Sequence, residues 1–149
     1  GRVALLTLAT DLQYLQSAKT NALHGTRLDL LEALAAKAAY AHRTNMPFYA
    51  WLGGLGATKA QRRGDTICAE PSATTGHVYK ALAIRELLEL EPRLEAVVYA
   101  DADAVPSLSS VKPEVYLRLA PNADVVGGGN PGLPIIMNSG ILIVRNTEW

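Results

Sequence analysis

Residues 97–106 read Val97-Val98-Tyr99-Ala100-Asp101-Ala102-Asp103-Ala104-Val105-Pro106. Four residues typical of a buried strand run directly into two carboxylates at positions i and i+2, and a proline soon ends the element. Because alternate side chains of a strand share a face, we expect Asp101 and Asp103 to point into one cleft at the carboxyl end of this strand. Open α/β sheets bind their ligands at that edge.

Two carboxylates this close repel each other unless a cation lies between them or one of them is protonated. A hard divalent cation such as Mg²⁺ or Mn²⁺ meets this need, and it takes its remaining ligands from water and substrate phosphates. The pair therefore predicts a metal–diphosphate site. The alternative is a strand that ends in an ordinary acidic turn, because Asp is common where a strand gives way to a loop. The apolar lead-in and the features downstream favour the metal site.

Length and composition indicate a globular protein. A chain of 149 residues suits one domain, residues 1–149, and 49% of its residues are hydrophobic. Its 14 basic side chains balance 14 acidic ones, so charge gives no reason to expect nucleic acid or an anionic membrane as a partner. No stretch approaches the roughly 18 apolar residues of a membrane span. The single Cys68 rules out an internal disulfide.

Apolar runs alternate with segments of helical periodicity along the chain. Strands are predicted at residues 3–10, 47–52, 97–100, 123–126 and 141–146, and helices at residues 28–43, 77–91 and from 113 to just before 121. Asp29 or Thr26 can cap the helix at 28–43, and Asn45 and Pro47 can end it. Residues 12–27 are interpreted as a loop with some helix, and residues 127–132 as a flexible turn. This alternation predicts an α/β fold whose mostly parallel sheet is flanked by helices.

The end of the first predicted strand offers candidate nucleotide contacts. In a nucleotide-binding sheet this strand end usually meets the base or the ribose, and here it carries Thr7, Ala9, Thr10 and Asp11. For each of these residues the alternative is an ordinary buried strand followed by a polar turn.

Two further places carry polar groups that could meet a ligand. Lys80 lies near the start of the helix at 77–91, just upstream of the aspartate strand, where it could reach a diphosphate. The alternative is a solvated surface lysine. Asn138-Ser139-Gly140 precedes an apolar run and puts a small backbone, an amide and a hydroxyl where something can approach closely.

Taken together, these motifs resemble a glycosyltransferase of the GT-A fold, a Rossmann-like α/β architecture. The closest likeness is glycosyltransferase family 34, the galactomannan galactosyl-, α-1,6-mannosyl- and xyloglucan xylosyltransferases. Their pattern has an opening strand like residues 2–10, a helix that carries a lysine, and a hydrophobic strand that ends in Asp-x-Asp-Ala. An Asn-x-Gly strand that ends in Arg-Asn and a tryptophan completes it, here residues 138–149.

The resemblance implies a retaining transferase that uses a UDP- or GDP-sugar, a glycan acceptor and Mn²⁺ or Mg²⁺. The sequence leaves the localisation open, and the Golgi lumen follows only if the resemblance holds and a membrane anchor ahead of Gly1 has been removed. Asp103 is favoured over Asp101 as the direct metal ligand. The implied site residues are Thr7, Ala9, Thr10, Asp11, Lys80 and Asp101 for the nucleotide, Ala102, Asn138, Ser139 and Gly140 for the donor sugar, and Asp101 and Asp103 for the metal.

The sequence departs from this family pattern in two places. A further metal ligand, often a histidine, usually follows the Asn-x-Gly strand, yet the last histidine here is His77. Gly127 to Asn130 also occupy the place where an acidic residue is often found. A fold truncated at its carboxyl end, forming an incomplete or non-catalytic nucleotide-sugar-binding fragment, is therefore an alternative to an active transferase.

A second alternative is a haloacid-dehalogenase-type phosphatase, because residues 98–105 also fit its signature. Asp101 would then be the nucleophile and Asp103 the general acid and base. That class further needs a downstream lysine and a later acidic pair for Mg²⁺. After Asp103 the chain offers one lysine and three isolated acidic residues, Lys112, Glu114, Asp124 and Glu148.

Overall fold

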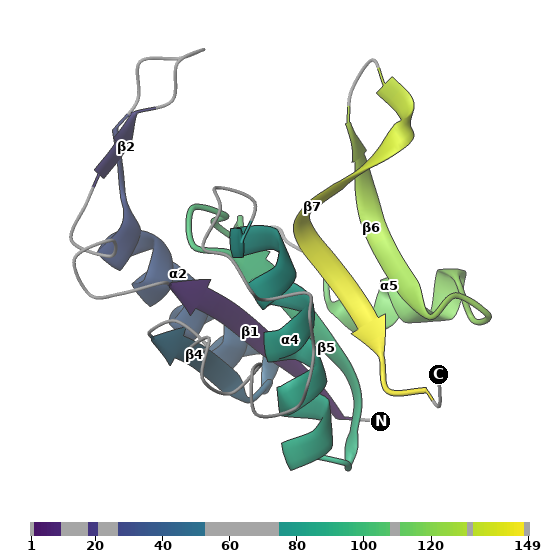
Figure 1. Cartoon of the computed structure of the whole chain (residues 1–149). Coiled ribbons are helices and arrows are strands. Elements are labelled where there is room, and N and C mark those ends of the chain that lie inside the picture. Colours follow the sequence, from purple (N-terminus) through teal and green to yellow (C-terminus); the bar gives the residue numbers. More distant parts are fainter. Residues whose placement is uncertain are drawn as a thin grey trace.

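The computed structural model describes residues 2–9, 18–20, 27–52, 75–107, 111–130 and 133–147. Five of its strands form one sheet in the order β4-β1-β5-β7-β6, and β2 and β3 form a separate antiparallel pair (Figure 1). In chain order the elements are β1 (Arg2–Ala9), β2 (Ala18–Thr20), β3 (Arg27–Asp29), α2 (Leu30–Thr44), β4 (Phe48–Leu52), α4 (Thr75–Leu90), β5 (Leu94–Asp101), α5 (Pro113–Leu119), β6 (Val125–Asn130) and β7 (Leu133–Arg145).

Four of the five strands of this sheet run in the same direction. β4 and β5 both pair in parallel with β1, whereas β7 is antiparallel to its neighbours β5 and β6. The predicted α/β fold with a mostly parallel sheet is therefore confirmed. Its carboxyl edge lies where β1, β4, β5 and β6 end, and the Asp101 turn follows β5 at that edge.

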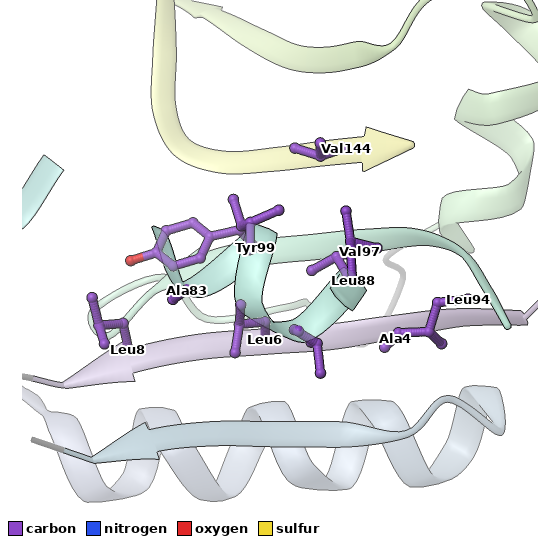
Figure 2. Close-up of a cluster of buried hydrophobic side chains, with 11 residues drawn as sticks. Ala4, Leu6, Leu8, Ala83, Leu88, Leu94, Val97, Tyr99 and Val144 are labelled. Carbon is purple, nitrogen blue, oxygen red and sulfur yellow. The ribbon is translucent and has the colours of Figure 1, made fainter. Parts of the chain in front are cut away.

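Both faces of the central strands are covered, which explains their continuous apolar sequences. On one face, α4 buries Ala83 and Leu88 in a cluster with Leu6 and Tyr99 (Figure 2). On the other face, α2 and α5 contribute residues such as Tyr40 and Leu117 to a second cluster. The core thus lies in two layers, one on each side of β1 and β5.

Helix α2 begins and ends as its sequence predicts. The Asp29 carboxylate accepts hydrogen bonds from the N–H groups of Leu31 (2.8 Å) and Glu32 (3.4 Å). At the other end Asn45 adopts a left-handed φ of 57°, and its N–H group bonds to carbonyls of the last turn. These two caps fix the register of the helix, and with it the residues that face the sheet.

Two predictions about irregular segments are wrong. Of the stretch 127–132 that was expected to be a turn, residues 127–130 belong to strand β6, in which Gly128 pairs with Asn138 and Gly129 with Met137, and residues 131–132 lie outside the described residues. Register shifts flank these glycines, so pairing with β7 outweighs their poor strand propensity. Within residues 12–27, expected to form a loop with some helix, residues 18–20 form strand β2 and residue 27 starts β3, whereas the rest of this range lies outside the described residues. Strands of three residues are too short to show an alternating pattern.

None of the helices in the described ranges combines the length and the apolar composition that crossing a bilayer requires.

Candidate functional site

A pocket of about 360 Å³ opens where the carboxyl end of β5 meets the glycines of β6 and the middle of β7. It brings together both predicted metal residues and two of the four predicted sugar-binding residues. The lining consists of Asp101, Asp103, Ala104, Gly128, Gly129, Asn138, Gly140 and Ile141.

A larger hollow of about 1040 Å³ lies beside it, between α4 and β7. Its walls are mainly apolar, with side chains such as Ile84, Leu88 and Leu142, and it meets the polar site through Lys80 and Ser139. Chemistry on a charged substrate needs convergent polar groups, and the carboxylates line the smaller pocket. We therefore take the smaller pocket as the candidate site.

A tight turn presents the two carboxylates to the pocket. The Ala104 N–H group donates to the Asp101 carbonyl over 3.0 Å and closes this turn directly after β5. Asp101 and Asp103 are half-buried, whereas Ala102 between them is buried. Both carboxylates line one pocket, but strand alternation is not the reason, because β5 ends at Asp101 and the turn carries Asp103 to the same place.

Asp101 is held by two donors. The Lys80 Nζ lies 2.9 Å from its Oδ1 and 3.2 Å from its Oδ2, and the Tyr99 hydroxyl donates to Oδ1 over 3.0 Å. Lys80 is 6% exposed, and its ammonium lies 5.4 Å from the centroid of the Tyr99 ring. This buried cation offsets one of the two adjacent negative charges.

Lys80 also connects α4 and β5 to strand β7. Its Nζ donates to the Ser139 carbonyl (3.1 Å) and to the Ser139 Oγ (3.2 Å). Lys80 is therefore not the solvated surface lysine of the alternative interpretation, because it is buried and reaches the end of the aspartate strand. Whether it also meets a diphosphate stays a prediction.

Gly140 lies where two side chains leave no room for another. A Cβ at this position would be 3.0 Å from the Asn138 Oδ1 and 3.3 Å from the Asp101 Oδ2. The Gly140 N–H group donates to the same Asn138 Oδ1 over 2.8 Å. The sequence predicted that some group approaches the backbone closely at Asn138-Ser139-Gly140. The groups that approach Gly140 are the side chains of Asn138 and Asp101.

Lys37 is a residue of this site that the sequence reasoning missed. It projects from α2, is 0% exposed, and donates from Nζ to the Ala102 carbonyl over 2.7 Å. Burial lowers the pKa of its ammonium from 10.5 to about 8, while the negative charges of Asp103 and Asp101 raise it. Helical spacing could have indicated that Lys37 is buried. It lies four residues from both Ala33 and Ala41, which belong to the buried face of the helix.

Other predicted site residues lie deeper or outside the described residues. Thr7 is 2% exposed, and its hydroxyl donates to the Ala100 carbonyl over 2.8 Å, which joins β1 to β5. Ala9 and Ala102 are also buried. Thr10 and Asp11 fall outside the described residues. Contacts of these five residues with a nucleotide or a sugar stay predictions.

The donor groups of the pocket fit a hard divalent cation that is shared with a ligand. Within the described ranges no group of three or more His, Cys, Asp and Glu residues could hold a metal by itself. The pocket instead offers two carboxylates and an amide, and Mg²⁺-type ions are commonly held by one or two carboxylates plus substrate phosphates and water.

The additional groups that a phosphatase would need do not line this pocket. Lys112, Glu114 and Asp124 are described, and none of them is among its lining residues. Asp124 precedes β6, which runs parallel to β5, so it lies at the opposite edge of the sheet from Asp101. The fourth candidate, Glu148, lies outside the described residues.

Comparison with known proteins agrees with this architecture. Among solved structures, the chain is similar to one described as the crystal structure of a glycosyltransferase involved in the glycosylation of the major capsid of PBCV-1. The TM-score is 0.62 at 14% sequence identity, and the match covers 97% of this chain and 60% of that chain. The two proteins share a fold. No protein-family model and no curated protein matches the sequence.

Proposed function

We propose that this chain carries the donor-binding site of a metal-dependent, retaining glycosyltransferase. It would move a hexosyl or pentosyl group from a UDP- or GDP-sugar to a glycan acceptor. The observation that supports this is the convergence of the Asp101–Asp103 turn with β6 and β7 in one pocket, at the carboxyl edge of a glycosyltransferase-like fold. The retaining outcome and the likeness to family 34 come from the sequence resemblance.

The charged residues of the pocket suit a nucleoside diphosphate. Asp103, together with Asp101, would hold Mn²⁺ or Mg²⁺, and such a cation neutralises the charge of a departing diphosphate. Lys80, which lines the neighbouring hollow, supplies a second positive charge beside the pocket, fixed by its contacts with Asp101 and Ser139. A charge held in place before the reaction stabilises developing negative charge without reorganisation.

The opposite wall of the pocket suits a sugar. A Cβ added at Gly128 or Gly129 would meet no atom within 4 Å, so there is open space beside these residues. Asn138 holds its Oδ1 on the Gly140 N–H group, which leaves its Nδ2 amide to donate to a sugar hydroxyl. Bond cleavage at the anomeric carbon through an oxocarbenium-like state mainly needs positioning and charge.

A segment that binds nucleotide sugars without turnover is the second candidate. The chain spans 60% of the length of the glycosyltransferase that it resembles, so an acceptor site and the complete activity are proposals for a larger protein. Both candidates require the same metal-dependent binding of a nucleoside diphosphate.

Calorimetric titration of UDP and GDP tests this binding. With Mn²⁺ present we expect one of the two nucleotides to bind the wild-type chain, and chelation with EDTA to abolish the binding. Asp103→Asn should weaken it at least about tenfold, because one carboxylate ligand is lost. Asp124→Asn is the matched control, since this exposed carboxylate accepts a bond from Thr147 at the far edge of the sheet.

Failure of both nucleotides to bind with metal present would contradict the proposal. So would equal affinities of Asp103→Asn and the wild type. Release of phosphate from a simple phosphomonoester, lost in Asp101→Asn, would favour the phosphatase instead.

A further inference from the structure

Lys37 approaches the aspartate turn from the face of the sheet opposite to Lys80. Lys37 belongs to α2 and Lys80 to α4, and these helices cover different faces of the sheet (Figure 1). Lys80 contacts the Asp101 side chain, whereas Lys37 donates to the backbone of the turn at Ala102. The turn that carries the two carboxylates therefore contacts two buried ammonium groups.

We propose that Lys37 is a positioning residue that fixes the Asp101–Ala104 turn, so that both carboxylates face the pocket before a ligand arrives. This inference rests on the proposed function for its ligand, a divalent cation with a nucleoside diphosphate. Lys37 acts on that ligand through the turn and makes no contact with it.

The first argument concerns the hydrogen bonds of the turn. The pairing of β5 with β7 ends at Ala100, and its pairing with β1 ends at Asp101. The Ala102 carbonyl lies beyond both ladders in a buried place, where an unpaired polar group is costly. Lys37 supplies the donor that the sheet no longer provides, at 2.7 Å.

The second argument concerns the cost of the lysine itself. Its neighbours on the buried face of α2, Ala33, Tyr40 and Ala41, belong to the hydrophobic core. A fully buried ammonium is expensive unless negative groups and acceptors compensate for it. Here the compensation comes from the Ala102 carbonyl and from the nearby charges of Asp103 and Asp101.

Lys37→Met and Tyr40→Phe form a matched pair for the test. Each change removes one hydrogen-bond donor of α2 that reaches a backbone carbonyl, buried for Lys37 and partly buried for Tyr40. The Lys37 ammonium donates to the Ala102 carbonyl in the turn. The Tyr40 hydroxyl donates to the Val111 carbonyl over 3.1 Å, outside the site. Loss of packing or of helix stability would affect both variants, but loss of turn geometry would affect Lys37→Met alone.

The first readout is the Kd for Mn²⁺, measured by electron paramagnetic resonance of the free ion, with UDP and with GDP. Replacing a residue that orients a metal ligand typically costs about 10–100-fold in affinity. We expect a loss in this range for Lys37→Met and no change for Tyr40→Phe. Equal Kd values for Lys37→Met and the wild type would overturn the positioning role.

The second readout needs no ligand and is the amide hydrogen exchange of Ala104, whose N–H group closes the turn. We expect exchange about tenfold faster in Lys37→Met than in Tyr40→Phe, with β1 amides reporting any global opening. If the wild type binds no Mn²⁺ with either nucleotide, the proposed function fails, and Ala104 exchange alone decides the positioning role. Unchanged exchange at Ala104 would overturn it.

A further variant covers the case in which Lys37→Met does not fold. Lys37→Gln keeps an N–H donor on a neutral side chain that is one bond shorter. It should weaken Mn²⁺ binding and speed Ala104 exchange in the same direction. Wild-type values for both quantities in Lys37→Gln would contradict the proposal.

Discussion

At the scale of single residues, the site depends on side chains that hold one another in place. The Asp101 carboxylate pairs with Lys80 and accepts a hydrogen bond from Tyr99. Gly140, which has no side chain, leaves room for the side chains of Asp101 and Asn138. The sequence could predict Asp101 and Asp103 as a close pair at the end of an apolar strand, although the turn after Asp101, and not strand alternation, brings both to one pocket. It could not predict the Lys37 contact, because that depends on which turn of α2 packs against a residue 65 positions further along the chain.

Replacing Gly140 with alanine should destabilise the protein by about 1–3 kcal/mol, the usual cost of overpacking. The added methyl group would lie 3.0 Å from the Asn138 Oδ1 and 3.3 Å from the Asp101 Oδ2. Gly128→Ala is the control, because a Cβ there meets no atom within 4 Å, and it should change stability by less than about 0.5 kcal/mol. Urea unfolding gives the free energy of unfolding of both variants. Equal stability losses would show that Gly140 is not sterically restricted.

At the scale of elements, Arg145 at the end of β7 joins three parts of the fold. Its guanidinium donates to the Leu117 carbonyl at the end of α5 (2.7 Å) and to the Ala123 carbonyl (3.0 Å), and it pairs with Glu95 of β5 (3.3 Å). A positive charge there also suits the carboxyl end of a helix. This connection holds β7 in the register that brings Ser139 and Gly140 to the Asp101 turn.

Arg145→Lys should therefore lower the free energy of unfolding by about 2 kcal/mol, although it keeps the charge. A single ammonium cannot serve acceptors that the planar guanidinium reaches in several directions, and each lost hydrogen bond costs about 1 kcal/mol. Arg118→Lys, at an exposed position of α5, should stay within about 0.5 kcal/mol. Thermal and urea unfolding compare the two. If Arg145→Lys left the free energy of unfolding unchanged, β7 would be held mainly by its pairing with β5.

Local signals predicted elements well where they were strong. Asp29 and Asn45 marked the ends of α2, and continuous apolar runs marked β1 and β5. The glycines of β6 misled because propensity describes the isolated chain, whereas their strand conformation comes from pairing with residues such as Asn138 on β7. That pairing also forms the glycine wall of the pocket, which periodicity could not reveal.

At the scale of the whole molecule, the order of the strands assembles the site. β5 lies between β1 and the antiparallel β7, so the turn after β5 faces the middle of β7 and the end of β6. The sequence predicted the class of fold from alternating strands and helices, and the motif predicted the carboxylates. The pairing of β7 with β5 on one side and β6 on the other joins residues distant in sequence, which is why the complete pocket emerged only from the structure.

The most direct measurement of the central claim is an anomalous difference map from crystals soaked with MnCl₂ and with UDP or GDP. The account predicts a manganese peak at coordination distance from the Asp103 carboxylate, in the pocket that Gly128 and Asn138 also line, with the diphosphate on its far side. Crystals of Asp103→Asn should lack the peak. A nucleotide bound without metal, or manganese bound away from Asp103, would contradict the account.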